Sequence, residues 1–385
     1  MHAIDEAAPA ILQVLPALDT GGVERGTIEV AEAQVAAGFR AFVASAGGRL
    51  VPELARVGAV HLTLPLASKD PLVIWRNAGK LAALVRENRI AILHARSRAP
   101  AWSAKLAARR TGAAFMTTYH GTYNEGLPFK RAYNAVMASG ERVIAISHFI
   151  AAHLIARHGT DPARVRVIPR GVDPRRFDPA SVQGDRMRRL ADAWRLPDGA
   201  PVILLPGRLT RWKGQGVLIE ALALMQRRDA VAVLAGDAQG REGYRATLER
   251  LAEARGVAAR LRMPGDCPDI PAGLMLADAV VSASTDPEAF GRVVIEGQAM
   301  GRPVVATAHG GAAETVTEGE TGWLVPPGDA AALAARLDAM LALDEAEREA
   351  LGARARASVL ARYTTPLMCA ATLDVYREVL AEHRP

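Results

Sequence analysis

The sequence has few cysteines, few aromatic residues and no long hydrophobic run. Cys267 and Cys369 are the only cysteines among 385 residues. Two cysteines argue against a disulfide framework and against a four-ligand zinc site built on them, and they suit a reducing compartment. No apolar run approaches the roughly 18 residues that a membrane-spanning helix needs, and residues 1–6 are unlike a secretory signal peptide. These absences predict a cytoplasmic protein and leave association with the inner face of the cytoplasmic membrane open.

Basic residues are concentrated in the first half of the chain. Residues 1–180 hold 23 Lys and Arg against 14 Asp and Glu, a formal charge of +9, whereas the remainder holds 24 against 27, a charge of −3. A positive field favours anionic partners such as phosphorylated saccharides, lipid headgroups or nucleic acid. Aromatic residues do not interleave with the basic ones, so we expect no nucleic-acid partner. Scattered solvated arginines are the alternative explanation for the charge.

Short apolar runs alternate with helical stretches along the whole chain, which predicts an α/β fold with parallel sheets. The apolar runs lie at residues 11–15, 41–44, 90–94, 115–120 and 143–147, and again at 202–206, 230–236, 261–265, 279–281 and 303–306. We interpret these as two doubly wound, Rossmann-like domains. Apolar periodicity disappears between residues 173 and 183, so we place the first domain at 1–177 and the second at 178–365. Residues 366–382 predict a final amphipathic helix.

Two glutamates eight positions apart follow the predicted strand at 279–281. Glu288 falls on the loop after this strand, and Glu296 falls within a predicted short helix at 293–300. Ligands bind outside the carboxyl ends of strands in such sheets, and free amides at a helix start attract phosphate. One glutamate can therefore hold sugar hydroxyls and the other a ribose diol.

A basic loop follows the first strand of the second domain. Arg208 and Lys213 lie five positions apart and are flanked by Gly207 and Gly214. The two cations can converge on one diphosphate, since arginine supplies a planar fork and lysine a point charge. Taken alone, two such cations are more often exposed to solvent, but the strand before them and the glutamates after them favour a phosphate site.

Two loops of the first domain also follow predicted strands. Gly21 and Gly22 lie between a strand and a helix, where the backbone can approach a phosphate or sugar, although a tight turn is the plain alternative. His120 follows the strand at 115–119 and precedes a glycine, at the edge where ligands bind. A lone histidine is otherwise more often structural. His94, with two nearby arginines, is a second candidate for contact with an acceptor, and a structural role is equally consistent with its position.

The order of these elements resembles the family 4 retaining glycosyltransferases. The second-domain loop is similar to that family's Gly-Arg-x4-Lys-Gly pattern, and the two glutamates are similar to its Glu-x7-Glu element. The resemblance extends from Gly21 to Tyr363. It implies a GT-B fold, in which two Rossmann-like domains face a cleft and the last helix crosses back to the first domain. A narrower likeness, to bacterial enzymes that build lipopolysaccharide core or surface glycans, comes from Glu24 and Arg25 after the glycines and from residues 95–100.

The resemblance also implies roles for individual residues. His120, Arg208, Lys213 and Glu288 are the expected catalytic set, with His120 against the transferred sugar and the two cations on the departing diphosphate. Glu288 would contact the ring hydroxyls of the sugar. The expected donor-binding residues are Gly21, Gly22, Gly207, Cys267, Phe290, Gly291, Arg292, Val293 and Glu296, with Glu296 on the ribose and the loop around Cys267 beside the nucleobase.

The resulting hypothesis is transfer of a hexosyl group with retention at the anomeric carbon. The donor is a nucleotide diphosphate sugar, with UDP-sugars expected first and GDP-sugars second, and the acceptor is a saccharide or a lipid-linked molecule. We expect no metal and no cofactor, because cations and amides can neutralise the diphosphate and the sequence has no Asp-x-Asp pair. The alternatives are a sugar phosphorylase of the same architecture, a non-catalytic two-lobed sugar-binding protein and a Rossmann-type oxidoreductase.

Overall fold

The computed structural model describes residues 8–19, 21–126 and 128–383. Residues 1–6, which we expect not to form a signal peptide, therefore lie outside the described residues. Thr20, just before the first glycine loop, lies outside them as well. The chain divides into two compact units, residues 1–169 with 366–385, and residues 170–365. The observed division comes eight residues before the predicted one at 177. Its cause is a long-range pairing, since the Val172 amide donates to the Tyr363 carbonyl at 2.9 Å and the Thr365 amide to the Val172 carbonyl at 2.8 Å.

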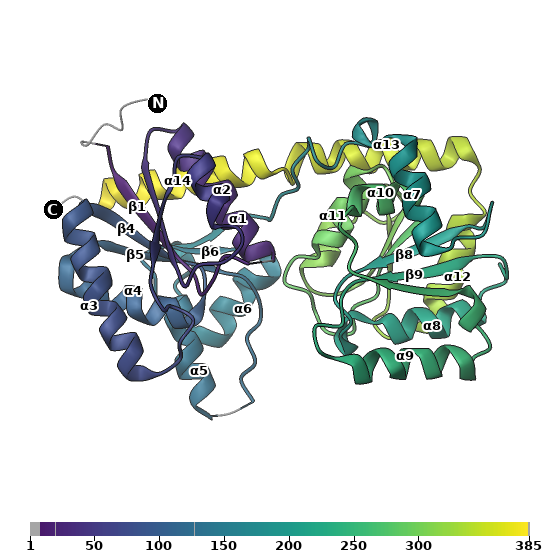
Figure 1. Ribbon diagram of the computed structural model, residues 1–385, viewed down its shortest axis with the longest axis horizontal. Coiled ribbons are helices and arrows are strands. Elements are labelled where there is room, and N and C mark those ends of the chain that lie inside the picture. The colour runs from purple at the N-terminus through teal and green to yellow at the C-terminus, as the bar shows by residue number, and fades with distance from the viewer. Residues whose placement is uncertain (1–7, 20, 127, 384–385) are drawn as a thin grey trace. The chain divides into compact units, whose positions relative to one another are not determined.

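The first unit is built on a seven-stranded parallel sheet in the order β3-β2-β1-β4-β5-β6-β7 (Figure 1). Its strands are β1 (Ala10–Val14), β2 (Arg40–Ser45), β3 (Val60–Thr63), β4 (Ile90–Ala95), β5 (Ala114–Tyr119), β6 (Val143–Ala145) and β7 (Val165–Val167). Its helices are α1 (Gly22–Ala36), α2 (Val51–Arg56), α3 (Pro71–Asn88), α4 (Arg98–Thr111), α5 (Pro128–Asn134), α6 (His148–His158) and α14 (Thr365–Glu382). The strand order reverses between β1 and β4, which are neighbours in the sheet although two strands separate them in sequence.

The second unit is built on a six-stranded parallel sheet in the order β10-β9-β8-β11-β12-β13. Its strands are β8 (Val202–Pro206), β9 (Val231–Ala235), β10 (Leu261–Gly265), β11 (Ala279–Ser282), β12 (Val304–Thr307) and β13 (Trp323–Val325). Its helices are α7 (Gly184–Trp194), α8 (Gln215–Leu224), α9 (Glu242–Ala254), α10 (Ile270–Leu276), α11 (Arg292–Ala299), α12 (Ala330–Leu341) and α13 (Glu345–Arg362). The order reverses between β8 and β11. The predicted fold class, two Rossmann-like α/β domains with parallel sheets, is confirmed.

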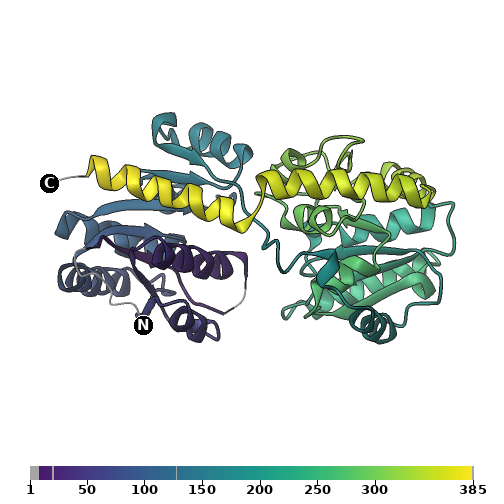
Figure 2. The ribbon, with the colours of Figure 1, turned by 90° about the horizontal axis from the view of Figure 1, so that it is seen from above.

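The final helix belongs to the core of the first unit. In α14, Met368, Leu373 and Val379 are buried together with Ile11 of β1 and Ile92 of β4. Figures 1 and 2 show this helix, in yellow, lying along the first sheet. The core of the first unit is therefore assembled from both ends of the chain. Within the described residues, no helix is both long enough and apolar enough to cross a membrane.

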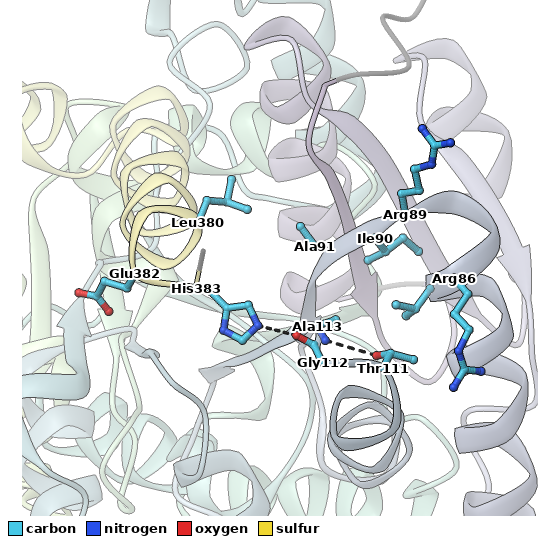
Figure 3. Close-up of a pocket in the computed structure, with 11 residues that line it drawn as sticks. Arg86, Arg89, Ile90, Ala91, Thr111, Gly112, Ala113, Leu380, Glu382 and His383 are labelled. Carbon is cyan, nitrogen blue, oxygen red and sulfur yellow. Dashed lines mark hydrogen bonds between the residues drawn. The ribbon is translucent and has the colours of Figure 1, made fainter. Parts of the chain in front are cut away.

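A pocket of about 550 Å³ opens at the amino ends of β4 and β5. Figure 3 shows Ile90 and Ala113 at the starts of these strands on one side and Leu380 and His383 on the other. His383 Nε2 lies 2.6 Å from the Gly112 carbonyl oxygen and closes one end of the hollow. Parallel α/β sheets bind their ligands at the carboxyl ends of strands, where the predicted functional loops lie. This pocket lies at the opposite edge of the sheet.

Candidate functional site

The carboxyl ends of β8 and β11 carry the predicted donor residues. These strands are neighbours in the second sheet, and the strand order reverses between them. Lys213 ends the 3₁₀ turn Arg211–Lys213 that follows β8, and Glu288 lies on the loop that follows β11. In sheets of this kind, a reversal of strand order is where ligands bind, outside the carboxyl ends of the strands. Two loops that are distant in sequence are thereby brought together.

Lys213 and Glu288 form an ion pair at this point. The Lys213 ammonium lies 2.8 Å from Glu288 Oε1, and the two side chains are 15% and 10% exposed. The hydroxyls of Ser284 and Ser282 donate to the same oxygen at 2.5 and 3.3 Å. Burial alone would raise the pKa of Glu288, but Lys213 and the two serines outweigh it, so this pKa is lowered. The carboxylate is consequently ionised at neutral pH and holds the lysine in place.

Two glycines allow the loops to approach so closely. Gly214 has a φ of +73°, and a Cβ atom there would lie 1.8 Å from the Ala283 carbonyl oxygen, so the turn that ends in Lys213 presses directly on the end of β11. Gly310 has a φ of +64°, and a Cβ atom there would lie 2.5 Å from the Glu288 carbonyl oxygen. Neither position accepts a side chain without movement of the backbone. The Lys213–Glu288 pair is therefore fixed by its surroundings as well as by its own charges.

Helix α11 begins beside this pair. Gly291, with a φ of +82°, is its N-cap, so the first amides of the helix are available at the loop. Arg292 and Glu296 are joined across one helical turn at 2.8 Å. Phe290 is buried, and its ring meets that of Tyr363 at 5.8 Å between centroids. The buried ring of Phe290 thus anchors the loop, and Glu296 lies on the first turns of the helix that follows it.

The remaining predicted donor residues of the second unit lie on neighbouring loops. Arg208 is exposed just after β8, next to Gly207, whose φ is +147°. Cys267 is buried after β10, and burial raises the pKa of its thiol to about 11, so the side chain is an inert thiol at neutral pH. Asp269 caps α10 and pairs with Arg186 at 2.7 Å. Neither the Cys267 thiol nor the paired Asp269 carboxylate is therefore available to a ligand in this structure.

Gly21, Gly22 and His120 belong to the first unit. Gly21 is the N-cap of α1, with a φ of +145°, and Gly22 is the first residue of that helix. His120 directly follows β5 and is half-buried. All three lie at the carboxyl ends of strands in the first sheet, as the sequence predicted.

His94 has a structural environment. It is fully buried, its Nδ1 lies 2.7 Å from the Tyr376 hydroxyl and its Nε2 lies 2.7 Å from Thr118 Oγ1. Burial and the charge of Arg96 hold the pKa of His94 well below its usual value, so the imidazole is neutral. This histidine joins β4, β5 and α14, and the structural alternative considered from the sequence is the one that the structure supports.

Sequence reasoning overlooked three residues around the ion pair. Ser282 and Ser284 donate to Glu288, and the ring of Trp212 lies 4.6 Å from the Lys213 ammonium. Ser282 is the last residue of β11 and Ser284 lies two positions beyond it, and in extended backbone this spacing places both side chains on one side. That alternation next to a glutamate is a signal that could have identified them.

Comparison with known proteins agrees with the fold. Residues 187–358 match the family described as Glycosyl transferases group 1, and residues 20–176 match Glycosyltransferase Family 4. The structure of a glycosyltransferase from Rickettsia africae is 38% identical, with a TM-score of 0.90 over 97% of this chain and 99% of that chain. The Anabaena protein Alr3699/HepE, solved in complex with UDP and glucose, has a TM-score of 0.82 at 23% identity over 96% of this chain and 100% of that one. This second likeness shows the fold alone.

Two Rossmann-like domains of this kind define the GT-B class of transferase fold. This chain belongs to the glycosyltransferases, with a family 4 domain followed by a group 1 domain. Among curated proteins, the D-inositol 3-phosphate glycosyltransferase of Salinispora tropica is 38% identical over 261 residues, which are 65% of this chain and 53% of that protein. The chain spans about half the length of the curated relatives it matches.

Proposed function

We propose that this chain transfers a hexosyl group from a nucleotide diphosphate sugar to an acceptor hydroxyl, with retention at the anomeric carbon. The observation that carries the proposal is the Lys213–Glu288 pair at the strand-order reversal of the second sheet. UDP-sugars are the first donors to test, which is supported by the UDP and glucose bound to the Anabaena protein of the same fold. GDP-sugars are the second.

The proposed chemistry depends on neutralising a departing diphosphate. As the bond between sugar and phosphate breaks, negative charge grows on the diphosphate, and positive groups already in place lower the barrier. Lys213 is held by Glu288 and by the ring of Trp212. Arg208 is exposed on the same loop, and the first amides of α11 add dipoles. This set supplies the charge that a metal ion supplies in other transferases, so we propose that the transfer needs no metal at the diphosphate.

Glu288 and Glu296 are positioning residues in this proposal. Three protein donors bind Glu288 Oε1, so contact with the hydroxyls of the donor sugar falls to Oε2. Glu296, on the first turns of α11, takes the ribose hydroxyls. His120 would lie against the transferred sugar from the first unit. The acceptor hydroxyl attacks from the face that the diphosphate leaves, and the leaving phosphate takes the proton of that hydroxyl, which gives retention without a covalent intermediate.

The ribose role predicts a loss of nucleotide affinity. Glu296→Gln should weaken UDP binding about 10-fold or more, because a hydrogen bond to a charged acceptor contributes about 1.5–3 kcal/mol. Isothermal titration with UDP measures this effect. Glu249→Gln is the matched control, since Glu249 also pairs with an arginine one turn away, Arg245, at 3.1 Å. An unchanged affinity in Glu296→Gln would contradict the role.

The acceptor side of the proposal is an anionic molecule. A pocket of about 480 Å³ in the first unit is lined by three cations, two aromatic rings and an amide, from Lys69, Arg98, Asn124, Phe129, Lys130 and Tyr133. A phosphorylated saccharide or lipid-linked intermediate of lipopolysaccharide or surface-glycan synthesis fits this chemistry, and a lipid-linked one would bring the enzyme to the cytoplasmic face of a membrane. The name of the Salinispora relative favours a phosphorylated cyclitol as the second acceptor to test.

Two measurements test the proposed function. A thermal-shift series with UDP, GDP and ADP, followed by their sugars, identifies the donor, because a ligand that binds only the folded chain raises the unfolding temperature. Product analysis then separates the alternatives. A glycosyltransferase releases a nucleoside diphosphate, a phosphorylase releases a sugar phosphate, and a binding protein leaves the donor intact. Release of sugar phosphate, or an intact donor with every acceptor tested, would overturn the proposal.

A further inference from the structure

Three side chains of the first unit converge beside Tyr119, the last residue of β5. Glu125 lies on the loop after β5, and His153 and His158 lie on α6. Each offers one ligand atom, and the three atoms lie within 4.8 Å of one another. The side chains of Glu125 and His158 are only 14% and 2% exposed. One carboxylate and two imidazoles form a set of ligands that transition metals such as zinc prefer.

Two atoms of this cluster are buried without a hydrogen-bond partner among the described residues. They are Glu125 Oε1 and His153 Nε2. The other carboxylate oxygen, Glu125 Oε2, accepts hydrogen bonds from the Arg157 guanidinium. Glu125 Oε1 instead faces His158 Nε2 at 3.8 Å. A buried polar atom without a partner costs about 1–3 kcal/mol, and a cation bound between these side chains would satisfy both atoms.

The surrounding groups support the arrangement. The Tyr119 hydroxyl lies 3.0 Å from His158 Nε2, and its ring packs against both imidazoles with centroids about 6 Å away. A neutral imidazole is the form that can ligate a metal. Arg157 and Arg131 are the nearby cations. The Arg157 side chain is 52% exposed, so water screens its charge while its hydrogen bonds orient the carboxylate.

We propose that Glu125, His153 and His158 bind a divalent transition metal of the zinc class. Zinc bonds of about 2.0–2.1 Å in a tetrahedral site place ligand atoms about 3.3 Å apart. The cluster must therefore contract by about 1.5 Å at most, which side-chain rotations can provide. His158 exchanges its Tyr119 contact for the metal, and a water molecule or the Tyr119 phenol takes the fourth position. The site goes beyond the proposed transfer reaction, since none of its ligands belongs to the donor site.

The ion would connect a loop to a helix. Glu125 belongs to the loop that begins at His120, whereas both histidines lie on α6, which the hydroxyl of Ser147 caps at its N-terminus. Binding would hold the middle of this loop against the C-terminal half of α6. The role of the ion is therefore structural, and it would order the segment that follows His120.

Metal titration of the full-length chain tests this inference. After treatment with a chelator and dialysis, the protein should bind one Zn²⁺ per chain in a calorimetric titration, and Zn²⁺ should raise its unfolding temperature. Co²⁺ is a spectroscopic probe of the same site, and one equivalent should produce visible d–d absorption typical of a four-coordinate nitrogen and oxygen site. Absence of both stoichiometric Zn²⁺ binding and the cobalt spectrum would overturn the proposal.

Variants assign the ligands. His153→Ala and Glu125→Gln should each weaken Zn²⁺ binding about 100-fold or more, since even supporting residues of metal sites contribute 10-fold to 100-fold. His383→Ala is the control. His383 also pairs with a glutamate, Glu141, at 3.1 Å, but among the described residues this pair belongs to no group of three metal-ligating side chains. Unchanged Zn²⁺ affinity in both cluster variants would overturn the assignment. If a variant fails to fold, the cobalt spectrum of the unaltered chain still decides whether the site exists.

Discussion

Lys213→Ala is expected to lower turnover about 100-fold or more. Removing one group that stabilises the charge of a transition state typically has an effect of this size. The lysine is the cation that the structure holds most firmly at the strand-order reversal, through Glu288 at 2.8 Å and the ring of Trp212 at 4.6 Å. Its effect should appear mainly in kcat, because the negative charge on the leaving diphosphate increases as the sugar departs. Steady-state kinetics with a UDP-sugar and the released UDP as the readout measures the change.

Arg211→Ala is the matched control for this experiment. Arg211 begins the same 3₁₀ turn as Lys213 and is exposed, so its loss removes a cation from the same loop without touching the ion pair. Its turnover should stay within about two-fold of the unaltered enzyme. Circular dichroism of both variants establishes that they are folded. A folded Lys213→Ala enzyme with full activity would show that Lys213 does not stabilise the leaving group.

Glu288→Ala is expected to reduce the free energy of unfolding by about 3 kcal/mol, since removing one member of a buried ion pair leaves the other charge uncompensated. Lys213 is only 15% exposed, and Ser282 and Ser284 would also lose their acceptor. Chemical denaturation followed by tryptophan fluorescence measures this loss. Glu220→Ala, which breaks an exposed pair with Arg255, should cost no more than about 1 kcal/mol. Equal losses in the two variants would contradict a special role for the buried pair.

The same pair predicts a dependence of stability on pH. The pKa of Glu288 is lowered in the folded chain, whereas an unfolded glutamate titrates near 4.3. The contribution of Glu288 to the free energy of unfolding is therefore complete above about pH 5, and it is lost as pH falls through the lower pKa of the folded chain. Between pH 5 and the onset of acid unfolding, Glu288→Gln should lose stability less steeply than the unaltered chain. If the stability of the two proteins fell equally steeply with pH, Glu288 would not be ionised in the folded protein.

Much of the fold follows from apolar runs in the sequence. The strands at the middle of each sheet, such as β4 and β8, are buried over most of their length and stand out as hydrophobic runs. The edge strands β3, β7 and β13 were not predicted, since exposed or half-buried residues dominate them. An edge strand packs against fewer neighbours, and its sequence carries less apolar signal. The division between the units was displaced for another reason, because it depends on a pairing between residues 172 and 364.

The positions of single residues at strand ends were predictable from the sequence, whereas the contacts between them were not. Lys213 and Glu288 were each expected at a strand end, but 75 residues separate them, and their direct bond depends on the neighbouring positions of β8 and β11. Local spacing also gives no sign of the Glu125, His153 and His158 cluster, because its carboxylate comes from a loop 28 residues before the first histidine. The role of His94 was undecided from sequence, since its partner Tyr376 is 282 residues away.

The position of α14 has a consequence for synthesis on the ribosome. Domains usually fold in order as the chain emerges, with the N-terminal one first. Here the first unit lacks Met368, Leu373 and Tyr376 from its core until residues 365–382 have been translated. The second unit is one continuous segment, residues 170–365, and can complete its core earlier. The nascent N-terminal sheet must therefore remain unfinished, with apolar surface exposed to chaperones, until the final helix is released.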